Sequence, residues 1–488
     1  MRLFKNTLAL SIVSAGQLVG NLILFSYLSR LLQPEGLGIY STVLAIFSTV
    51  SLGCGIGLNS FLVRELPIDL SQTNRYLIHA GLVSAMTGFA FMIGLDLLIP
   101  HLGYLPQTQT GLYIISLALI AESLAIVLNA IFIAHQKAEF IAAAGLMSIL
   151  GRISVSLLIL HLGFGVIGLI VINTGFYFLT PLVNFMFLKR YILVPHWKFD
   201  WPFLLEMLRG LKVFAALALL SALFSQSEVL ILSLIRGETQ VGYYSAALKL
   251  VTIWSLVPSS YMTAMFPVLS ASFQDSRQKA VNLQNRSLKY LSAIAFPLAV
   301  GMTIMAGAII PLFYGPGFQE SIATLRLLSW YLPLVFYNMV LWRVLVVRGD
   351  QRIVFRVQLI TEILQAFLAL WLIPKFGCQG AAFALLGGNL AYTVFHVYYV
   401  QRDKTPLPLV QFGWRFVLAS IGMGIITWFF TPRLHLFLLI PGAVVVYLAM
   451  LWMLRAFSTR DIALLKQILR FGKGQPVREE ISFPDLKE

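Results

Sequence analysis

The chain has 488 residues, of which 59% are hydrophobic and 11% are charged. Soluble domains are about 45–50% apolar and about 25% charged, so a soluble protein of this length is excluded. The net charge of +15 does not indicate nucleic-acid binding, because the cations gather in short segments between apolar runs, as in membrane proteins. The composition predicts an all-α integral membrane protein.

Apolar runs recur along the whole chain, and about 20 apolar residues are enough for a helix to cross a membrane. We predict about fourteen such helices, because the runs are too long for the strands of an outer-membrane barrel. No small-residue cleavage site follows the first run, which we interpret as a retained helix. The predicted spans lie near residues 8–29, 37–57, 77–99, 111–134, 141–162, 164–188, 211–235, 241–262, 288–312, 323–347, 354–373, 377–400, 413–430 and 436–456.

The distribution of lysine and arginine predicts the topology. An even number of spans puts both termini on one side, and that side then holds most of the loop cations. The opposite loops hold little more than Arg30, Arg236, Lys375 and Arg433. Because cytoplasmic loops carry the excess of basic residues, we expect both termini in the cytoplasm of a bacterial or archaeal cell, with the protein in its cytoplasmic (inner) membrane.

Two short echoes indicate an internal repeat. Residues 29–41, SRLLQPEGLGIYS, resemble residues 233–245, SLIRGETQVGYYS, with Gly38 aligned on Gly242 at an offset of 204. A second echo aligns Gly165 with Gly377 at an offset of 212. Both fall at equivalent places, which predicts two parallel six-helix lobes related by an axis along the membrane normal. The predicted parts are an N-terminal lobe (1–188), a cytoplasmic linker (189–210), a C-terminal lobe (211–400), two additional helices (401–457) and a cytoplasmic tail (458–488).

Enzyme signatures are missing from the sequence. There is no HExxH, GxSxG, Walker loop or CxxC pair, which are the motifs of zinc, serine, nucleotide and redox chemistry. We therefore predict a protein that is not an enzyme, has no catalytic residues, and needs no cofactor or metal.

Polar residues inside the apolar runs are the functional candidates, because an ionisable group near the bilayer centre costs about 2.5–3.5 kcal/mol to insert. They form stripes at helical spacing in runs that the repeat places in register, which is typical of a water-filled cavity between lobes. Lys249 is the strongest candidate, since it lies deep in its run. The members of these stripes are Gln17, Asn21, Ser225, Glu228, Ser245 and Lys249.

Four further charges leave alternatives open. Arg152 and Glu362 are 210 residues apart, close to the repeat. They either neutralise buried charges, each other included, or contact the substrate. Glu122 either pairs with Arg152 or takes a coupling proton. Glu122, Glu228 and Glu362 are all candidates for ion coupling, and spacing does not choose among them.

The run LSRLLQPEGLGIYS, the later VGYYSAALKL and the arrangement of two lobes plus two helices resemble the polysaccharide transporter family. These are O-antigen-type flippases for lipid-linked oligosaccharides, in the multidrug/oligosaccharidyl-lipid/polysaccharide (MOP) flippase superfamily. Gln33 and Leu37 replace the usual glycine and aromatic residue of the family pattern. The resemblance implies a MATE-like fold, alternating access between the lobes, and a polyprenyl-pyrophosphate-linked oligosaccharide substrate for cell-surface polysaccharide, such as lipopolysaccharide O-antigen.

That substrate implies a cationic cavity group, for which Lys249 fits best and Arg30, near the outer end, is a second candidate. The resemblance also implies membrane lipids as partners, with polysaccharide assembly proteins as further candidates. Two alternatives remain. One is a cation-coupled multidrug exporter of the same superfamily. The other is a multispan polymerase or glycosyltransferase, which typically needs a large outer loop that this sequence lacks.

Overall fold

The computed structural model describes residues 2–402, 407, 409–431 and 435–457. The chain separates into two compact units, Met1–Leu407 and Pro408–Glu488. The predicted cytoplasmic tail (458–488) lies outside the described residues. Every regular element in the described part of the chain is a helix, which confirms the all-α class.

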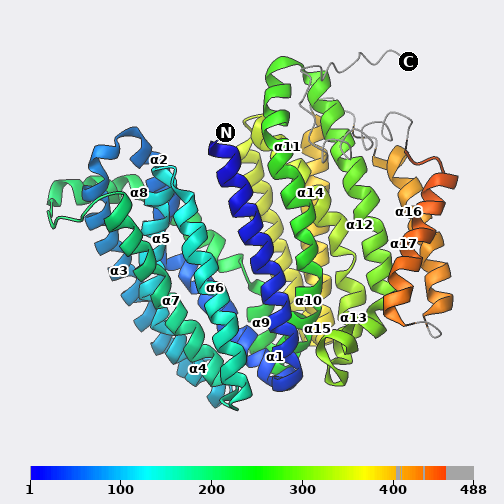
Figure 1. The fold of residues 1–488 in the computed structure, drawn as a ribbon, viewed down its shortest axis with the longest axis horizontal. Helices are drawn as coiled ribbons and strands as arrows, with labels where there is room; N and C mark the ends of the chain where they lie inside the picture. The colour runs from blue at the N-terminus through cyan, green and yellow to red at the C-terminus, as the bar shows by residue number, and fades with distance from the viewer. Residues whose placement is uncertain (1, 403–406, 408, 432–434, 458–488) are drawn as a thin grey trace. The chain divides into compact units, whose positions relative to one another are not determined.

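The larger unit contains two sets of helices (Figure 1). The first set is α1 (Arg2–Cys54), α2 (Leu58–Glu65), α3 (Thr73–Leu98), α4 (Pro106–Ser116), α5 (Ala118–Ala134), α6 (Ala138–His161) and α7 (Gly165–Tyr191). The second set, in chain order, is α8 (Trp201–Phe224), α9 (Ser227–Arg236), α10 (Glu238–Thr252), α11 (Leu256–Asp275), α12 (Arg277–Tyr314), α13 (Glu320–Leu328), α14 (Tyr331–Val347) and α15 (Gln351–Arg402). The start of α8 nevertheless lies beside α2 and α3, and its Phe203 and Met207 share a hydrophobic core cluster with Phe61 of α2 (Figure 1). The smaller unit holds α16 (Leu409–Phe430) and α17 (Leu436–Met453).

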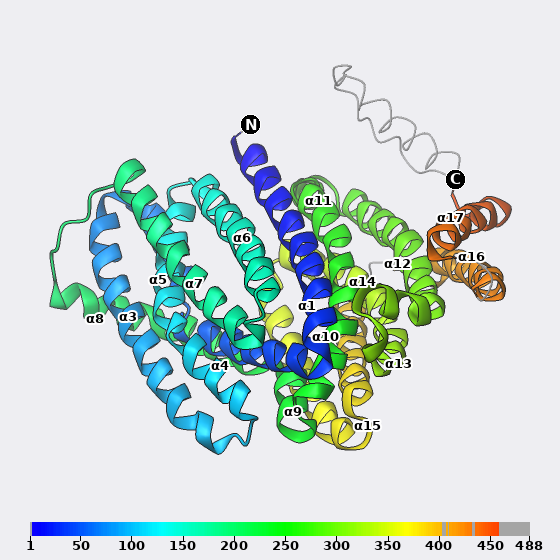
Figure 2. The same ribbon diagram turned by 60° about the horizontal axis from the view of Figure 1, so that its bottom comes forward.

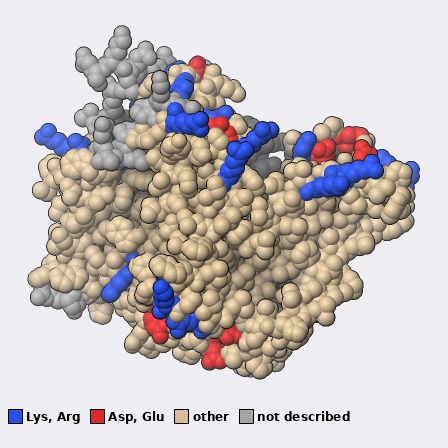
Figure 3. Space-filling view, turned by 180° about the vertical axis from the view of Figure 1, so that it is seen from behind, with Lys and Arg blue, Asp and Glu red and all other residues tan. Residues whose placement is uncertain are grey.

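The described part of the chain has ten helices long and apolar enough to cross a membrane, or eleven if the bent pair α4–α5 is one span. The predicted number of fourteen is therefore not confirmed. Part of the difference is that α1 and α15 each contain two of the predicted spans. On the face seen in Figure 3, the middle is almost free of charged side chains, and lysine and arginine gather mainly along the upper edge, with a smaller group of charges near the lower edge.

Helix α1 is a hairpin rather than one straight rod. Gln33 has φ 58° and ψ 178°, and the following Pro34 has no N–H to donate, so the helix is interrupted there. One chain of hydrogen bonds connects both arms. Asn21 of the first arm accepts from Arg152, and Tyr40 of the second arm accepts from Asn173. Arg152 also donates to Asn173, which joins the two bonds. In a straight helix, 19 residues would separate Asn21 from Tyr40 by about 28 Å.

Helix α15 folds back in the same way. Gly377 has φ 56° and ψ −130°, conformations that glycine adopts without steric cost, and Pro374 lies just before it. A Cβ at Gly388 would lie 2.4 Å from Oε1 of Gln365, although a straight helix would separate these residues by about 35 Å. The two arms therefore pack against each other.

The predicted span 211–235 is interrupted, and this prediction is corrected. Helix α8 starts at Trp201, ten residues earlier, and ends at Phe224; α9 begins at Ser227. Asp200 caps α8 by accepting a hydrogen bond from the Phe203 N–H at 3.3 Å. The predicted linker 189–210 is thus the end of α7, an irregular segment and the first turns of α8.

Helices α1 and α10 touch backbone to backbone at the two copies of the first echo, residues 29–41 and 233–245. A Cβ at Gly38 would lie 1.7 Å from the carbonyl oxygen of Glu238, and one at Gly242 would lie 2.0 Å from that of Pro34. Pro34 and Glu238 are 204 residues apart, as are Gly38 and Gly242. The contact is therefore reciprocal, as a twofold relation between the repeats requires. We call it the glycine crossing. Figure 2 shows α1 passing beside α10.

Candidate functional site between the two helix sets

Near the glycine crossing, each helix set forms hydrogen bonds with the other. Ser26 donates to the carbonyl of Phe313 at 2.5 Å, and Arg30 donates to the carbonyls of Leu312 and Phe313 at the end of α12. In return, Glu238 accepts hydrogen bonds from the α4 end of the first set. Its partners are the Leu105 N–H at 3.1 Å and the Thr108 hydroxyl at 2.8 Å. Together with the crossing, these bonds hold the two sets together at this end.

A polar cluster connects α1, α6 and α7 beyond the crossing. Arg152 on α6 donates to the amide oxygen of Asn21 on α1 at 3.0 Å and to that of Asn173 on α7 at 3.3 Å. Asn173 donates to the Tyr40 hydroxyl at 3.1 Å. The Nε atom of Arg152 is buried and has no hydrogen-bond partner in the structure. A buried donor without a partner is costly, so this guanidinium has capacity for a further acceptor.

Lys249 approaches this cluster from the second helix set. It lies on α10, and its Nζ atom is 5.8 Å from the centre of the Phe25 ring on α1. Phe25 lies one helical turn after Asn21, which accepts a hydrogen bond from Arg152. Neither cation forms an ion pair with any described residue. Two like charges in a medium of low dielectric repel each other, and an anion between them removes that repulsion.

The other predicted substrate ligands occupy different places. Ser245 lies one turn before Lys249 on α10, half-buried. Ser225, at the end of α8, is 3.4 Å from the Thr49 hydroxyl of α1, so it contacts the other helix set. Arg30 lies at the glycine crossing rather than in the polar cluster. The side chain of Gln17 lies outside the described residues.

The three acidic candidates separate into two groups. Glu228, buried at the start of α9, accepts a hydrogen bond from Gln365 on α15. Glu362, one turn from Gln365, accepts from Gln358 at 2.9 Å. Glu122 on α5 has no hydrogen bond within the described residues. The alternatives in which Arg152 pairs with Glu362 or Glu122 are not realised, because Arg152 is bonded to two asparagines instead.

Sequence reasoning missed Asn173 and Tyr40. Asn173 is an amide within the apolar run 164–188, and its cost in a membrane could have marked it. Tyr40 belongs to the repeated motif, and its hydroxyl gives it a second role as an acceptor for Asn173. Phe25 gives no polar signal, so only the structure connects it with Lys249.

Solved structures with the same fold are transporters. The chain matches "Lipid II flippase MurJ, inward closed conformation" with a TM-score of 0.74 and 16% identity, covering 90% of this chain and 97% of that one. It matches an inward-facing multidrug resistance MATE family transporter of the MOP superfamily with a TM-score of 0.64 and 17% identity, over 79% and 94%. The fold is thus the MATE-like fold of MOP-superfamily transporters.

Sequence comparison gives the particular family. The family model for "Polysaccharide biosynthesis protein" matches residues 27–323, and the chain belongs to this family. It is 22% identical over 436 residues to "Putative O-antigen transporter" of Escherichia coli (strain K12), covering 83% of this chain and 98% of that protein. It is 23% identical over 210 residues to "Probable low-salt glycan biosynthesis flippase Agl15" of Haloferax volcanii, covering 43% and 44%.

Proposed function

We propose that this protein translocates a polyprenyl-pyrophosphate-linked oligosaccharide from the cytoplasmic to the outer leaflet of a bacterial or archaeal cytoplasmic membrane. The observation that carries the proposal is the unpaired Arg152 and Lys249, contributed by different helix sets. A pyrophosphate is a compact polyanion that both cations can contact at once. A cationic drug would be repelled there, which disfavours the multidrug-exporter alternative.

In this mechanism the two helix sets are the two lobes of an alternating-access carrier. The glycine crossing and the hydrogen bonds of Arg30 and Glu238 close the cavity at the outer side. The pyrophosphate binds between Lys249 and Arg152, with Asn21 holding the guanidinium in position. Movement of the lobes then breaks the contacts at the crossing and opens the opposite path. The protein acts as a transporter and makes no covalent intermediate.

Reconstitution tests this proposal directly. The purified full chain in liposomes is expected to translocate a fluorescent polyprenyl-pyrophosphate oligosaccharide, measured as loss of accessibility to a membrane-impermeant quencher. Arg152→Ala and Lys249→Ala should reduce the rate to that of protein-free liposomes. Uptake of a cationic drug against a proton gradient, with no movement of the lipid, would contradict the proposal and favour an exporter.

The same assay tests ion coupling. We propose that Glu228 and Glu362 carry the coupling ion, because each accepts a hydrogen bond from a glutamine of α15, Gln365 or Gln358, and neighbouring carboxylates interact when charged. An imposed ion gradient should accelerate translocation by the wild type but not by Glu228→Gln. The matched variant Glu122→Gln should keep the acceleration. If Glu122→Gln is the only variant that loses the acceleration, the coupling site lies at Glu122.

Cysteine labelling tests the orientation. Cys54 and Cys378 are the chain's only cysteines and both are buried, so replacing them by serine gives a background for single cysteines. A membrane-impermeant maleimide added to intact cells should label Gln107→Cys but not Gln278→Cys. Labelling of Gln278→Cys alone would reverse the proposed topology.

A further inference from the structure

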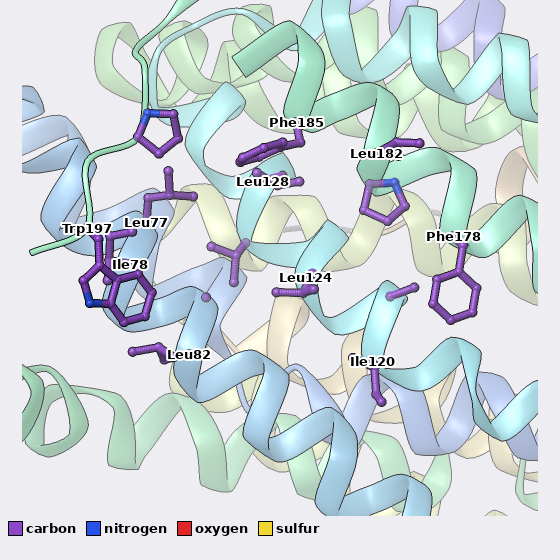
Figure 4. Close-up of a pocket in the computed structure, with 15 residues that line it drawn as sticks. Leu77, Ile78, Leu82, Ile120, Leu124, Leu128, Phe178, Leu182, Phe185 and Trp197 are labelled. Atoms are coloured by element: carbon purple, nitrogen blue, oxygen red, sulfur yellow. The ribbon is translucent and has the colours of Figure 1, made fainter. Parts of the chain in front are cut away.

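A groove lined by apolar side chains lies between α3, α5 and α7, and its volume is about 610 Å³. Leu77 and Ile78 of α3, Leu124 of α5 and Phe178 of α7 contribute to its walls. Trp197, from the segment after α7, closes one end (Figure 4). Trp197 is 71% exposed. Apolar surface of this kind favours contact with hydrocarbon over water.

The depth of the groove corresponds to one leaflet of a bilayer. Along α7 it extends from Phe178 to Phe185, and Lys189 follows one turn later. The 11 residues from Phe178 to Lys189 rise about 16 Å along the helix. Half of the hydrocarbon core is about 15 Å thick. A chain in the groove would therefore reach from the bilayer centre to the level of Lys189.

Two lysines lie next to residues that line the groove, one after Phe185 on α7 and one after Trp197. The Nζ atom of Lys189 is 4.8 Å from the centre of the Phe185 ring, which lines the groove. Lys198 is exposed and directly follows Trp197. Neither lysine has a carboxylate partner among the described residues.

The nearest carboxylate in the sequence, that of Asp200, is already occupied. Arg75 donates a hydrogen bond to Asp200, and this bond lowers the pKa of the Asp200 carboxyl. Asp200 therefore stays charged beside Arg75 and does not satisfy Lys198. The positive charge at the mouth of the groove is complementary to an anionic headgroup.

We propose that this groove is a binding site for a resident anionic phospholipid, with one acyl chain between α3, α5 and α7 and its phosphate at Lys189 and Lys198. The groove lies on a different side of α7 from the central cluster. Asn173 and Thr180 of α7 bond to Arg152 and Ser148 of α6, whereas Phe178 and Phe185 line the groove. None of the residues that line the groove belongs to helices α8–α15. This separation favours a bilayer lipid over the hydrocarbon tail of a substrate held at Lys249.

Native mass spectrometry of the full chain tests the proposal, with dioleoylphosphatidylglycerol and dioleoylphosphatidylcholine as probes. The wild type should retain one phosphatidylglycerol, bound about fivefold more tightly than phosphatidylcholine for each lysine engaged. Lys189→Glu should abolish that preference. Lys212→Glu, on the exposed side of α8, is the charge control and should keep it.

A glycine pair gives the matched control for the apolar part. A Cβ at Gly81, which lines the groove, or at Gly94, on the same helix outside it, would meet nothing within 4 Å. Gly81→Leu should fill the groove and lose the bound lipid and its thermal stabilisation, whereas Gly94→Leu should retain both. Equal phosphatidylglycerol binding in wild type, Gly81→Leu and Lys189→Glu would overturn the proposal. Displacement of that lipid by equimolar polyprenyl phosphate would also overturn it, by giving the groove to the substrate tail.

Discussion

Lys249→Ala is expected to abolish export of surface glycan while the amount of protein in the membrane stays normal. The substitution removes the one cation of α10, whose Nζ lies 5.8 Å from the centre of the Phe25 ring on α1. Losing one partner of a desolvated charge pair costs about 2–5 kcal/mol, which is roughly 30-fold or more in binding. Export is measured as surface glycan on cells, and abundance by immunoblotting of membranes.

The choice of substitution separates charge from shape. Lys249→Arg keeps the cation and should retain part of the export, whereas Lys249→Glu should be at least as inactive as alanine because it repels the pyrophosphate. Lys212→Ala, an exposed lysine on α8, is the matched control and should export normally. Normal export by Lys249→Ala would contradict the assignment of this lysine to the substrate site.

Gly242→Leu is expected to force the glycine crossing open. A side chain at this position would meet the carbonyl oxygen of Pro34 at 2.0 Å, and backbone cannot rotate away as a side chain can. Overpacking typically costs about 1–3 kcal/mol, and each 1.4 kcal/mol shifts a two-state equilibrium about tenfold. The population of carriers closed at the glycine crossing should therefore fall about 10- to 100-fold, and export should be lost.

Spin labels at Gln107 and Gln319, both exposed and on different helix sets, report the opening. Double electron–electron resonance should show a longer distance in Gly242→Leu than in the wild type. Gly307→Leu is the control, since a Cβ there would meet nothing within 4 Å; it should keep the wild-type distance and export. An unchanged distance in Gly242→Leu would mean that this contact does not hold the carrier closed.

Much of the fold was predictable because membrane helices are long and apolar. The interruption between Phe224 and Ser227 was not, since Ser225 and Gln226 are neither glycine nor proline, and hydropathy does not register a bend. The hairpins of α1 and α15 are different. The sequence analysis predicted a separate span on either side of each turn, and these spans agree with the folded-back arms; Pro34 and Pro374 lie at the turns.

The candidate site was predicted in part. The repeat pointed to the region of Lys249, and Asn21 does contact Arg152. The same repeat was misleading when it suggested a pair between Arg152 and Glu362. Under the predicted twofold relation, equivalent positions meet only on the axis that relates the two halves, and Gly38 and Gly242 are an equivalent pair in contact. Residues away from the axis find partners within their own helix set, such as Asn173 for Arg152 and Gln358 for Glu362.

The glycine crossing also has a consequence for how this chain tolerates mutation. If two copies of one unit met across a true twofold axis, a single codon would specify both glycines, and any change would act twice at one contact. In the fused chain the two positions mutate independently, yet each faces the backbone of the other. A change at one glycine therefore cannot make room for a larger side chain at the other. On the predicted repeat, positions away from the crossing are free to differ, as Ala45 and Lys249 do at an offset of 204, whereas the close backbone contact holds both crossing positions to glycine.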